Sequence, residues 1–194
     1  MNKIRFISLT ASLVLAITFT LSCDSKEANG TFTDSRDGKT YKKVKIGKQT
    51  WMAENLNFVP AKGSVCYDAR ESNCNKYGRL YNWEAAKQAC PAGWHLPTQD
   101  EWMALYDYAG GNWNLKSETG WRDNENGNDS YGFSALSGGY IESIPIPTGE
   151  EGGWWTATEA GNGSAYIKDM TNYREYQGLD SEKKNLFSVR CVQN

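Results

Sequence analysis

The sequence predicts an α+β domain with one mostly antiparallel sheet, two short helices and a long loop region. Strand-like alternation occurs early and late in the chain, and helical spacing occurs between the two. Runs of strands separated by a run of helices favour helices gathered on one side of an antiparallel sheet. No internal repeat or second domain is visible. The expected strands cover residues 39–46, 49–54, 154–159, 165–170 and 186–192.

The first two strands are expected to form a hairpin. Residues 39–46 (KTYKKVKI) place Tyr41, Val44 and Ile46 among lysines. Gly47 and Lys48 can form a two-residue turn before the chain returns as QTWMAE.

From Asn82 on, the spacing of apolar residues changes from strand-like to helical, and two helices are expected. In the first, Asn82 is a suitable N-cap, and Trp83, Ala86 and Cys90 share one helical face. In the second, the segment 98–101 (TQDE) is a capping box. Its apolar face would carry Trp102, Leu105, Tyr106 and Ala109, and Gly110–Gly111 would end it.

Residues 112–153 form the long, polar, glycine-rich loop region. Loops of this length are usually functional or mobile. An aromatic ring with a polar handle, exposed in a loop, is a common contact for sugars or proteins. Because neighbouring strand residues point to opposite faces, one of Trp154 and Trp155 is expected in the core and the other at the surface. The candidate ligand-binding residues are Trp121, Tyr140, Trp154 and Trp155, with Trp113 and Tyr131 in the same region.

The N-terminus predicts export. Lys3 and Arg5 precede an apolar run over residues 6–21, as in a secretory signal. The next residues, Thr-Leu-Ser-Cys ending at Cys23, resemble the lipobox of bacterial lipoproteins, although that family prefers leucine where this chain has Thr20. We therefore expect a signal peptide over residues 1–22, a lipidated Cys23 with a flexible tether over residues 23–35, and one domain over residues 36–194. The alternative is an ordinary signal peptide followed by a chance cysteine.

Four cysteines remain after Cys23, and four cysteines allow three connectivities. Cys66 and Cys74 lie in one short polar region, so a local bond between them is the economical choice. Cys90 would then pair with Cys191. The spacings contain no C-x-x-C pair, which argues against a metal site.

Composition excludes some functions. The formal net charge is −2, and no basic stripe of the kind that nucleic-acid binders carry is visible.

The single histidine, His95, has no catalytic partner placed beside it by sequence, so a structural role is favoured. The segment 123–129 (DNENGND) is rich in oxygen ligands that calcium favours, but it fails the EF-hand spacing and suits ordinary turns. Glu150 and Glu151 are interpreted as solvated loop residues. We expect no catalytic residue and no cofactor, with calcium kept as the alternative.

Five sequence blocks carry a family resemblance: GKQTWMAENLNF, GRLYNWEAAKQACPAGWHLPTQDEWMAL, YGFSALSGGY, WWTATE and FSVRCV. In this order they resemble the Fibrobacter succinogenes major paralogous domain family, a set of bacterial surface and secreted proteins of unknown molecular role. The likeness covers about residues 38–192.

More distantly, the helical blocks, the Trp-Trp-Thr strand and the terminal cysteine resemble the C-type-lectin-like fold. That resemblance implies a bond between Cys90 and Cys191. The calcium-binding Glu-Pro-Asn, Gln-Pro-Asp and Trp-Asn-Asp motifs of sugar-binding C-type lectins are absent. The segment WHLPTQDEW is also similar to formylglycine-generating sulfatase-modifying enzymes, but only Cys191 stands where those enzymes need a reactive cysteine pair.

These observations favour a non-catalytic binding or adhesion domain, lipid-anchored at the bacterial cell envelope, at the outer membrane or cell surface. Its expected ligand is a polysaccharide or a surface protein. The alternatives are an enzyme related to the formylglycine-generating proteins and a structural envelope protein without a small ligand.

Overall fold

The computed structural model describes residues 29–171 and 178–194. Its helices are α1 (Glu71–Tyr77), α2 (Trp83–Ala89) and α3 (Gln99–Ala109). Its strands are β1 (Gly30–Thr33), β2 (Thr40–Ile46), β3 (Gln49–Met52), β4 (Ser64–Val65), β5 (Leu80–Tyr81), β6 (Trp94–His95), β7 (Tyr140–Ile141), β8 (Pro145–Ile146), β9 (Gly152–Gly161), β10 (Ser164–Met170), β11 (Asp180–Glu182) and β12 (Val192–Gln193). Single 3-10 turns occupy Tyr67–Ala69, Asn112–Asn114 and Arg122–Asn124.

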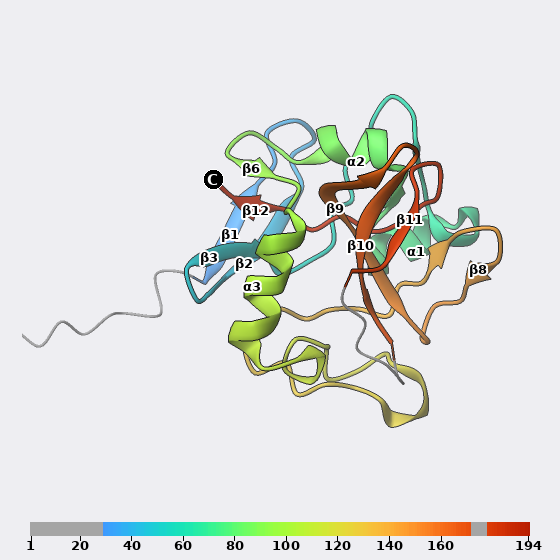
Figure 1. Ribbon diagram of the computed structural model, residues 1–194. Coiled ribbons are helices and arrows are strands. Elements are labelled where there is room, and N and C mark those ends of the chain that lie inside the picture. The colour runs from blue at the N-terminus through green and yellow to red at the C-terminus, as the bar shows by residue number, and fades with distance from the viewer. Residues whose placement is uncertain (1–28, 172–177) are drawn as a thin grey trace, which may run out of the picture.

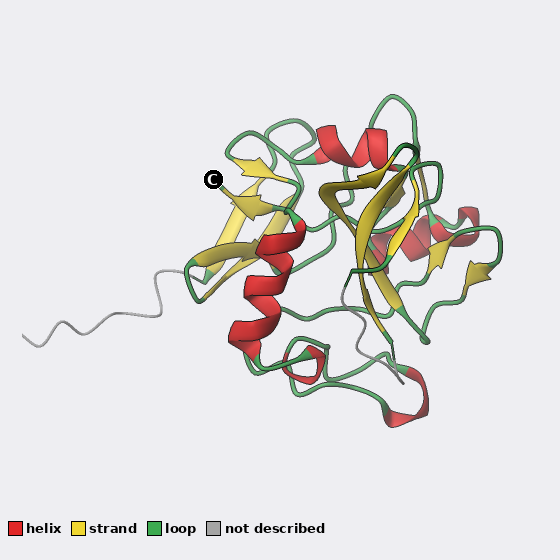
Figure 2. Ribbon diagram, in the orientation of Figure 1, coloured by secondary structure: helices red, strands yellow, loops and turns green. Residues whose placement is uncertain are grey.

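The α+β class is confirmed, but the strands form several sheets instead of one. A five-stranded antiparallel sheet has the order β1-β2-β3-β12-β6, and a three-stranded sheet has the order β11-β10-β9. Two further pairs, β4-β5 and β7-β8, are separate. Figure 1 shows α3 crossing the front between the two larger sheets. Below α3 the chain runs mostly as loops with single helical turns (Figure 2), and β8 lies to the right of this region (Figure 1).

The expected strand over residues 186–192 is mostly not a strand. Phe187 and Ser188 make only isolated bridges, to Tyr81 and Trp154, and a regular ladder returns at β12. The segment passes through the interior, so Ser188 and Arg190 are as buried as their apolar neighbours. The alternation of apolar and polar residues over residues 186–192 therefore does not indicate a strand with one face in solvent.

The predicted hairpin is confirmed. β2 and β3 pair from Lys43↔Met52 to Ile46↔Gln49. Gly47 has φ +60°, a conformation that glycine adopts without steric penalty, so it closes the two-residue turn.

The two predicted helices are confirmed together with their caps. The Asn82 side chain accepts a hydrogen bond from the Ala85 backbone N–H at the start of α2. Thr98 and Glu101 form the capping box of α3, and Gly110 ends that helix in the left-handed conformation. Helix α1 was not predicted, because its sequence, ESNCNKY, has no apolar stripe and its N-cap, Arg70, makes no side-chain cap bond.

Two disulfide bonds are present, and they are the pairings expected from the sequence. Cys66–Cys74 closes a short loop over α1, with a Cα–Cα distance of 5.0 Å. Cys90–Cys191 joins the end of α2 to the last segment across 101 residues of sequence.

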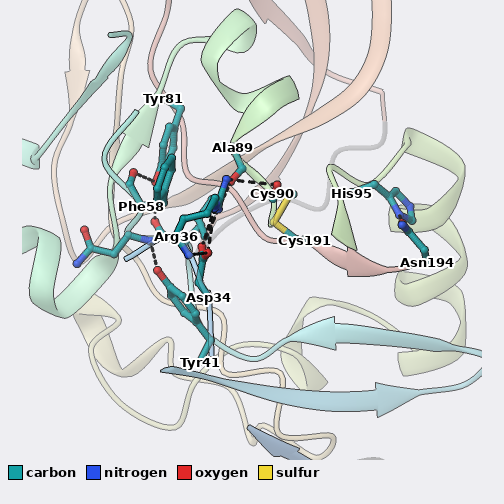
Figure 3. The surroundings of a disulfide bond; sticks show 12 residues. Asp34, Arg36, Tyr41, Phe58, Tyr81, Ala89, Cys90, His95, Cys191 and Asn194 are labelled. Carbon is teal, nitrogen blue, oxygen red and sulfur yellow. Dashed lines mark hydrogen bonds and ion pairs between the residues drawn. A yellow bond between two sulfur atoms is a disulfide. The ribbon is translucent and has the colours of Figure 1, made fainter. Parts of the chain in front are cut away.

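The folded domain begins earlier than expected, which corrects the tether predicted over residues 23–35. Strand β1 pairs with β2, and Phe32 stacks on Trp94 with ring centroids 4.3 Å apart. Asp34 is buried and accepts two hydrogen bonds from Arg36, whose guanidinium also donates to the Ala89 carbonyl at 2.7 Å. Figure 3 shows Arg36 between Asp34 and the Cys90–Cys191 bond. This guanidinium lowers the pKa of the Asp34 carboxyl below its usual range.

Two hydrophobic cores lie on the two sides of β9. One gathers Trp155 with Trp83 of α2 and with Phe187. The other gathers Trp154 with Trp102 of α3 and with Trp51 of β3. The adjacent tryptophans do point to opposite faces, but both faces are covered.

Among the described residues, no helix is both long enough and apolar enough to cross a membrane. The predicted signal peptide and Cys23 lie outside the described residues.

Candidate functional site

A pocket of about 380 Å³ opens where four distant segments meet: the start of β2, the chain after β3, the end of α1 and the loop before β7. It lies beside the Cys66–Cys74 bond, since Cys74 is one of its walls. The lining combines polar and apolar surface, with amides, hydroxyls and amines arranged around two tyrosine rings. The lining residues are Lys39, Thr40, Tyr41, Lys42, Ala53, Glu54, Asn55, Asn57, Cys74, Asn75, Lys76, Tyr77, Gly78, Gly132, Ser134 and Leu136.

Asn55 fixes the floor of this pocket. Its Oδ1 accepts hydrogen bonds from Trp154 Nε1 at 2.8 Å and from Arg190 Nε at 2.9 Å. Its Nδ2 donates to the Tyr77 carbonyl at 2.8 Å, which connects the floor to α1. Because both ends of the amide are bonded, the floor is held in one arrangement.

Arg190 lies directly beneath this floor and is 0% exposed. Its guanidinium donates to the carbonyls of Phe133 and Ser134 and lies 4.2 Å from the centroid of the Phe133 ring. In the described part of the chain it forms no ion pair with a carboxylate. Burial lowers the pKa of Arg190 to about 9, so the group stays positively charged at neutral pH.

One wall of the pocket is built around Asn57. Its backbone N–H donates to the Tyr41 hydroxyl at 3.1 Å, and its carbonyl accepts a hydrogen bond from the Lys39 ammonium. Burial raises the pKa of Tyr41 to about 12, so its hydroxyl stays protonated. The side-chain Oδ1 of Asn57 is buried and accepts no hydrogen bond from the described residues. An unsatisfied buried acceptor is costly, and this oxygen lies within the wall and is not open to the pocket.

The rim of the pocket is positively charged. Lys42 and Lys76 are exposed and form no ion pair within the part of the chain that is described, while Lys39 is balanced by Asp37 at 3.5 Å. The one carboxylate in the lining, Glu54, accepts a hydrogen bond from the Lys42 backbone N–H at 2.7 Å.

The four aromatic residues predicted to contact a ligand are not at the surface, and this prediction is wrong. Trp154 and Trp155 are both 0% exposed, and Trp121 is 4% exposed. Each indole N–H is used internally; that of Trp155, for example, donates to the Tyr81 carbonyl at 2.7 Å. Tyr140 stacks on Phe187, and its hydroxyl donates to Glu151. The loop region folds back on the domain, so that Trp121, Phe133 and Tyr140 pack into the cores.

Other aromatic rings are exposed instead. Tyr108, on the outer face of α3, is 58% exposed, and Trp113 is 54% exposed. The Tyr108 and Tyr131 ring centroids are 5.8 Å apart. Tyr108 borders a shallow depression of about 460 Å³, whose other lining residues are Ile46, Gly47, Lys48, Gln49 and Ala104.

His95 has a structural position. Its Nδ1 lies 2.7 Å from Asn194 Oδ1 and its Nε2 lies 2.8 Å from Glu101 Oε1. The ring therefore ties the C-terminal segment to the start of α3, and Figure 3 shows it facing Asn194.

The acidic loop residues have separate partners. Glu150 pairs with Arg122, whereas Glu151 accepts from Tyr140. Asp129, in the oxygen-rich segment, accepts from the Ser134 backbone N–H at 2.7 Å. Among the described residues, one group of three or more His, Cys, Asp or Glu side chains is close enough to share a metal ion: Cys66, Glu71 and Cys74. Two of those are joined in a disulfide.

The pocket was missed because its lining residues come from separate segments and no local motif marks them as a group. One signal was available in WMAENLNF, where Asn55 and Asn57 interrupt a run of otherwise apolar positions around Leu56. Tyr108 could also have been identified, since it lies off the apolar stripe of its helix.

Comparison with known proteins gives one match. Residues 44–193 match the sequence model of the Fibrobacter succinogenes major domain. No curated protein and no solved structure matches the chain. The likeness to the C-type-lectin-like fold therefore stays a prediction.

Proposed function

The chain belongs to the Fibrobacter succinogenes major domain family, and on that premise we propose that it is a non-catalytic binding domain of the bacterial cell envelope whose ligand is a polysaccharide. The observation that carries this proposal is the pocket itself, in which four segments bring amide, hydroxyl and ammonium groups together beside apolar surface.

The lining suits a polyhydroxylated ligand. Ligand sites are concave and use a few fixed polar groups to set orientation. Here Asn75 offers an exposed amide, and Lys42 and Lys76 offer ammonium donors at the rim. The rigid floor at Asn55 keeps these groups in place before a ligand arrives, which reduces the entropic cost of binding.

The enzyme alternative is less well supported. A chemistry based on a cysteine pair needs thiols, and Cys90 and Cys191 are joined to each other. His95, the one histidine, is engaged on both ring nitrogens and lies outside the pocket lining. We propose that neither catalysis nor calcium is part of the function.

The proposed binding is tested by affinity electrophoresis of the full-length protein, in neutral detergent, through gels containing plant and bacterial polysaccharides. Asn57→Ala is expected to weaken retardation about tenfold, because the pocket wall loses the side chain that shapes it beside Tyr41 and Lys39. Its stability to urea should not fall, since the oxygen that is removed has no partner in the described chain. Chelator should leave the retardation of the wild-type protein unchanged.

Asn162→Ala is the matched control, because Asn162 is an exposed asparagine in the turn between β9 and β10. The proposal fails if no polysaccharide retards the wild-type protein. It fails equally if Asn57→Ala is retarded as strongly as Asn162→Ala.

We also propose that Cys23 carries the lipid anchor, with the apolar run over residues 6–21 as its export signal. Several acyl chains hold a protein firmly to a membrane, whereas one holds it only marginally. The processed wild-type protein should partition into the detergent phase of a Triton X-114 separation, and Cys23→Ala should move to the aqueous phase. Equal partitioning of both proteins would refute a lipid on Cys23.

A further inference from the structure

Resting on the proposed function, we infer that the ligand is an acidic polysaccharide, bound as an extended chain from the pocket along β2 to the exposed ring of Tyr108. The observations behind this are the charge of the pocket and the closeness of the second hollow, which β2 and the Tyr131–Gly132 segment connect to it.

The pocket is electropositive although the whole chain is slightly acidic. Lys42 and Lys76 stand at its rim without ion-pair partners in the described residues, and Arg190 lies under its floor. The carboxylates of Asp129 and Glu54 near Arg190 offset only part of this positive charge. A buried cation keeps much of its field, because little water lies around it to screen the charge. Sugar carboxylates complement this arrangement, whereas a neutral glycan leaves it uncompensated.

The second hollow lies near the first, although the two share no lining residue. Gly132 lines the pocket, and the ring of the preceding residue, Tyr131, contacts Tyr108 at the edge of the depression. Strand β2 bridges the same two places, since Lys42 lines the pocket and Ile46 lines the depression. Four residues of strand separate Lys42 from Ile46, which corresponds to about 13 Å at the usual rise of a strand. A single sugar ring cannot span that distance, but a chain of several can.

The proposed binding track, which runs from the pocket along β2 to Tyr108, offers different chemical groups at its two ends. At the pocket end the ligand meets ammonium and amide groups. At the other end, Tyr108 presents a ring that is more than half exposed, with Lys48 and Gln49 beside it. An aromatic face that carries polar neighbours suits the apolar face of a sugar ring together with its hydroxyls.

The probes are polygalacturonate and alginate as acidic chains, and fully methyl-esterified polygalacturonate as the same backbone without charge. A galacturonate dimer and a decamer test chain length. Binding by the full-length protein in neutral detergent is measured by titration calorimetry at low and at high salt.

The variants are Lys42→Gln and Tyr108→Ala. Lys184→Gln, which removes one exposed positive charge near β11, and Ile144→Ala, which trims an exposed apolar side chain, are the matched controls.

We expect at least one acidic chain to bind, with affinity falling about tenfold on esterification and falling further with salt. Lys42→Gln should weaken binding of the dimer and the decamer alike, by about tenfold. Tyr108→Ala should weaken only the longer chain, by up to tenfold. Both controls should bind like the wild-type protein.

Equal affinity for the charged and the esterified polymer, or retardation in gels by neutral glycans alone, would overturn the acidic ligand and leave the proposed function standing. An unchanged decamer affinity in Tyr108→Ala would overturn the extended track. Failure of every polysaccharide to bind would overturn the proposed function itself, and the further inference with it.

Discussion

Removing the Cys90–Cys191 disulfide in the variant Cys90→Ala/Cys191→Ala is expected to lower the free energy of unfolding by about 4.7 kcal/mol. The bond closes a loop of 101 residues, and constraint of the unfolded chain grows with loop length. It also joins the end of α2 to the buried terminal segment, where Cys191 is fully buried. Urea denaturation of the variant and the wild-type protein measures the difference.

The internal control is Cys66→Ala/Cys74→Ala, which opens a loop with a sequence separation of 8. The same chain-entropy model gives about 2.5 kcal/mol for that bond. Equal losses in the two double variants, or no loss in the first, would show that loop closure does not account for the stability contributed by Cys90–Cys191.

Replacing Arg190 by methionine is expected to lower the free energy of unfolding by about 3 kcal/mol. Methionine approximates the volume of the side chain, so cavity formation is limited. The carbonyls of Phe133 and Ser134 would lose their donors, and each unsatisfied buried acceptor costs about 1–3 kcal/mol. Asn55 would keep only the Trp154 indole as a partner for its oxygen, which loosens the pocket floor.

Arg122→Met is the control for this measurement. Arg122 forms an exposed ion pair with Glu150, and such pairs contribute less than about 1 kcal/mol. Urea denaturation again gives the comparison. An Arg190→Met protein as stable as the wild type would mean that the buried guanidinium is not needed to satisfy the carbonyls around it.

The elements that could be predicted from the sequence are those with local signals. The hairpin of β2 and β3 has alternation and a glycine turn, and α3 has a capping box and a terminal glycine. The two disulfides followed from cysteine number and spacing. Helix α1 has no such signal, because it is a polar segment fixed by the Cys66–Cys74 bond.

The candidate site could not be predicted because it depends on tertiary packing. Whether Trp121 or Tyr140 is exposed is decided by how residues 112–153 fold back on the sheets, and no local pattern encodes that. The pocket is assembled from Lys42, Asn57, Lys76 and Ser134, which lie in four separate segments. Arg190 is similar: within FSVRCV it looks like the solvated position of a strand, yet it is fully buried.

The most direct measurement is hydrogen–deuterium exchange of the full-length protein with and without the polysaccharide that retards it most strongly. If the polysaccharide binds in the pocket, amide exchange should slow in the four segments that line it, with little change around β9 and β10. These segments are residues 39–42, 53–57, 74–78 and 132–136. Protection confined to other segments, or no protection under conditions where the polymer is bound, would contradict it.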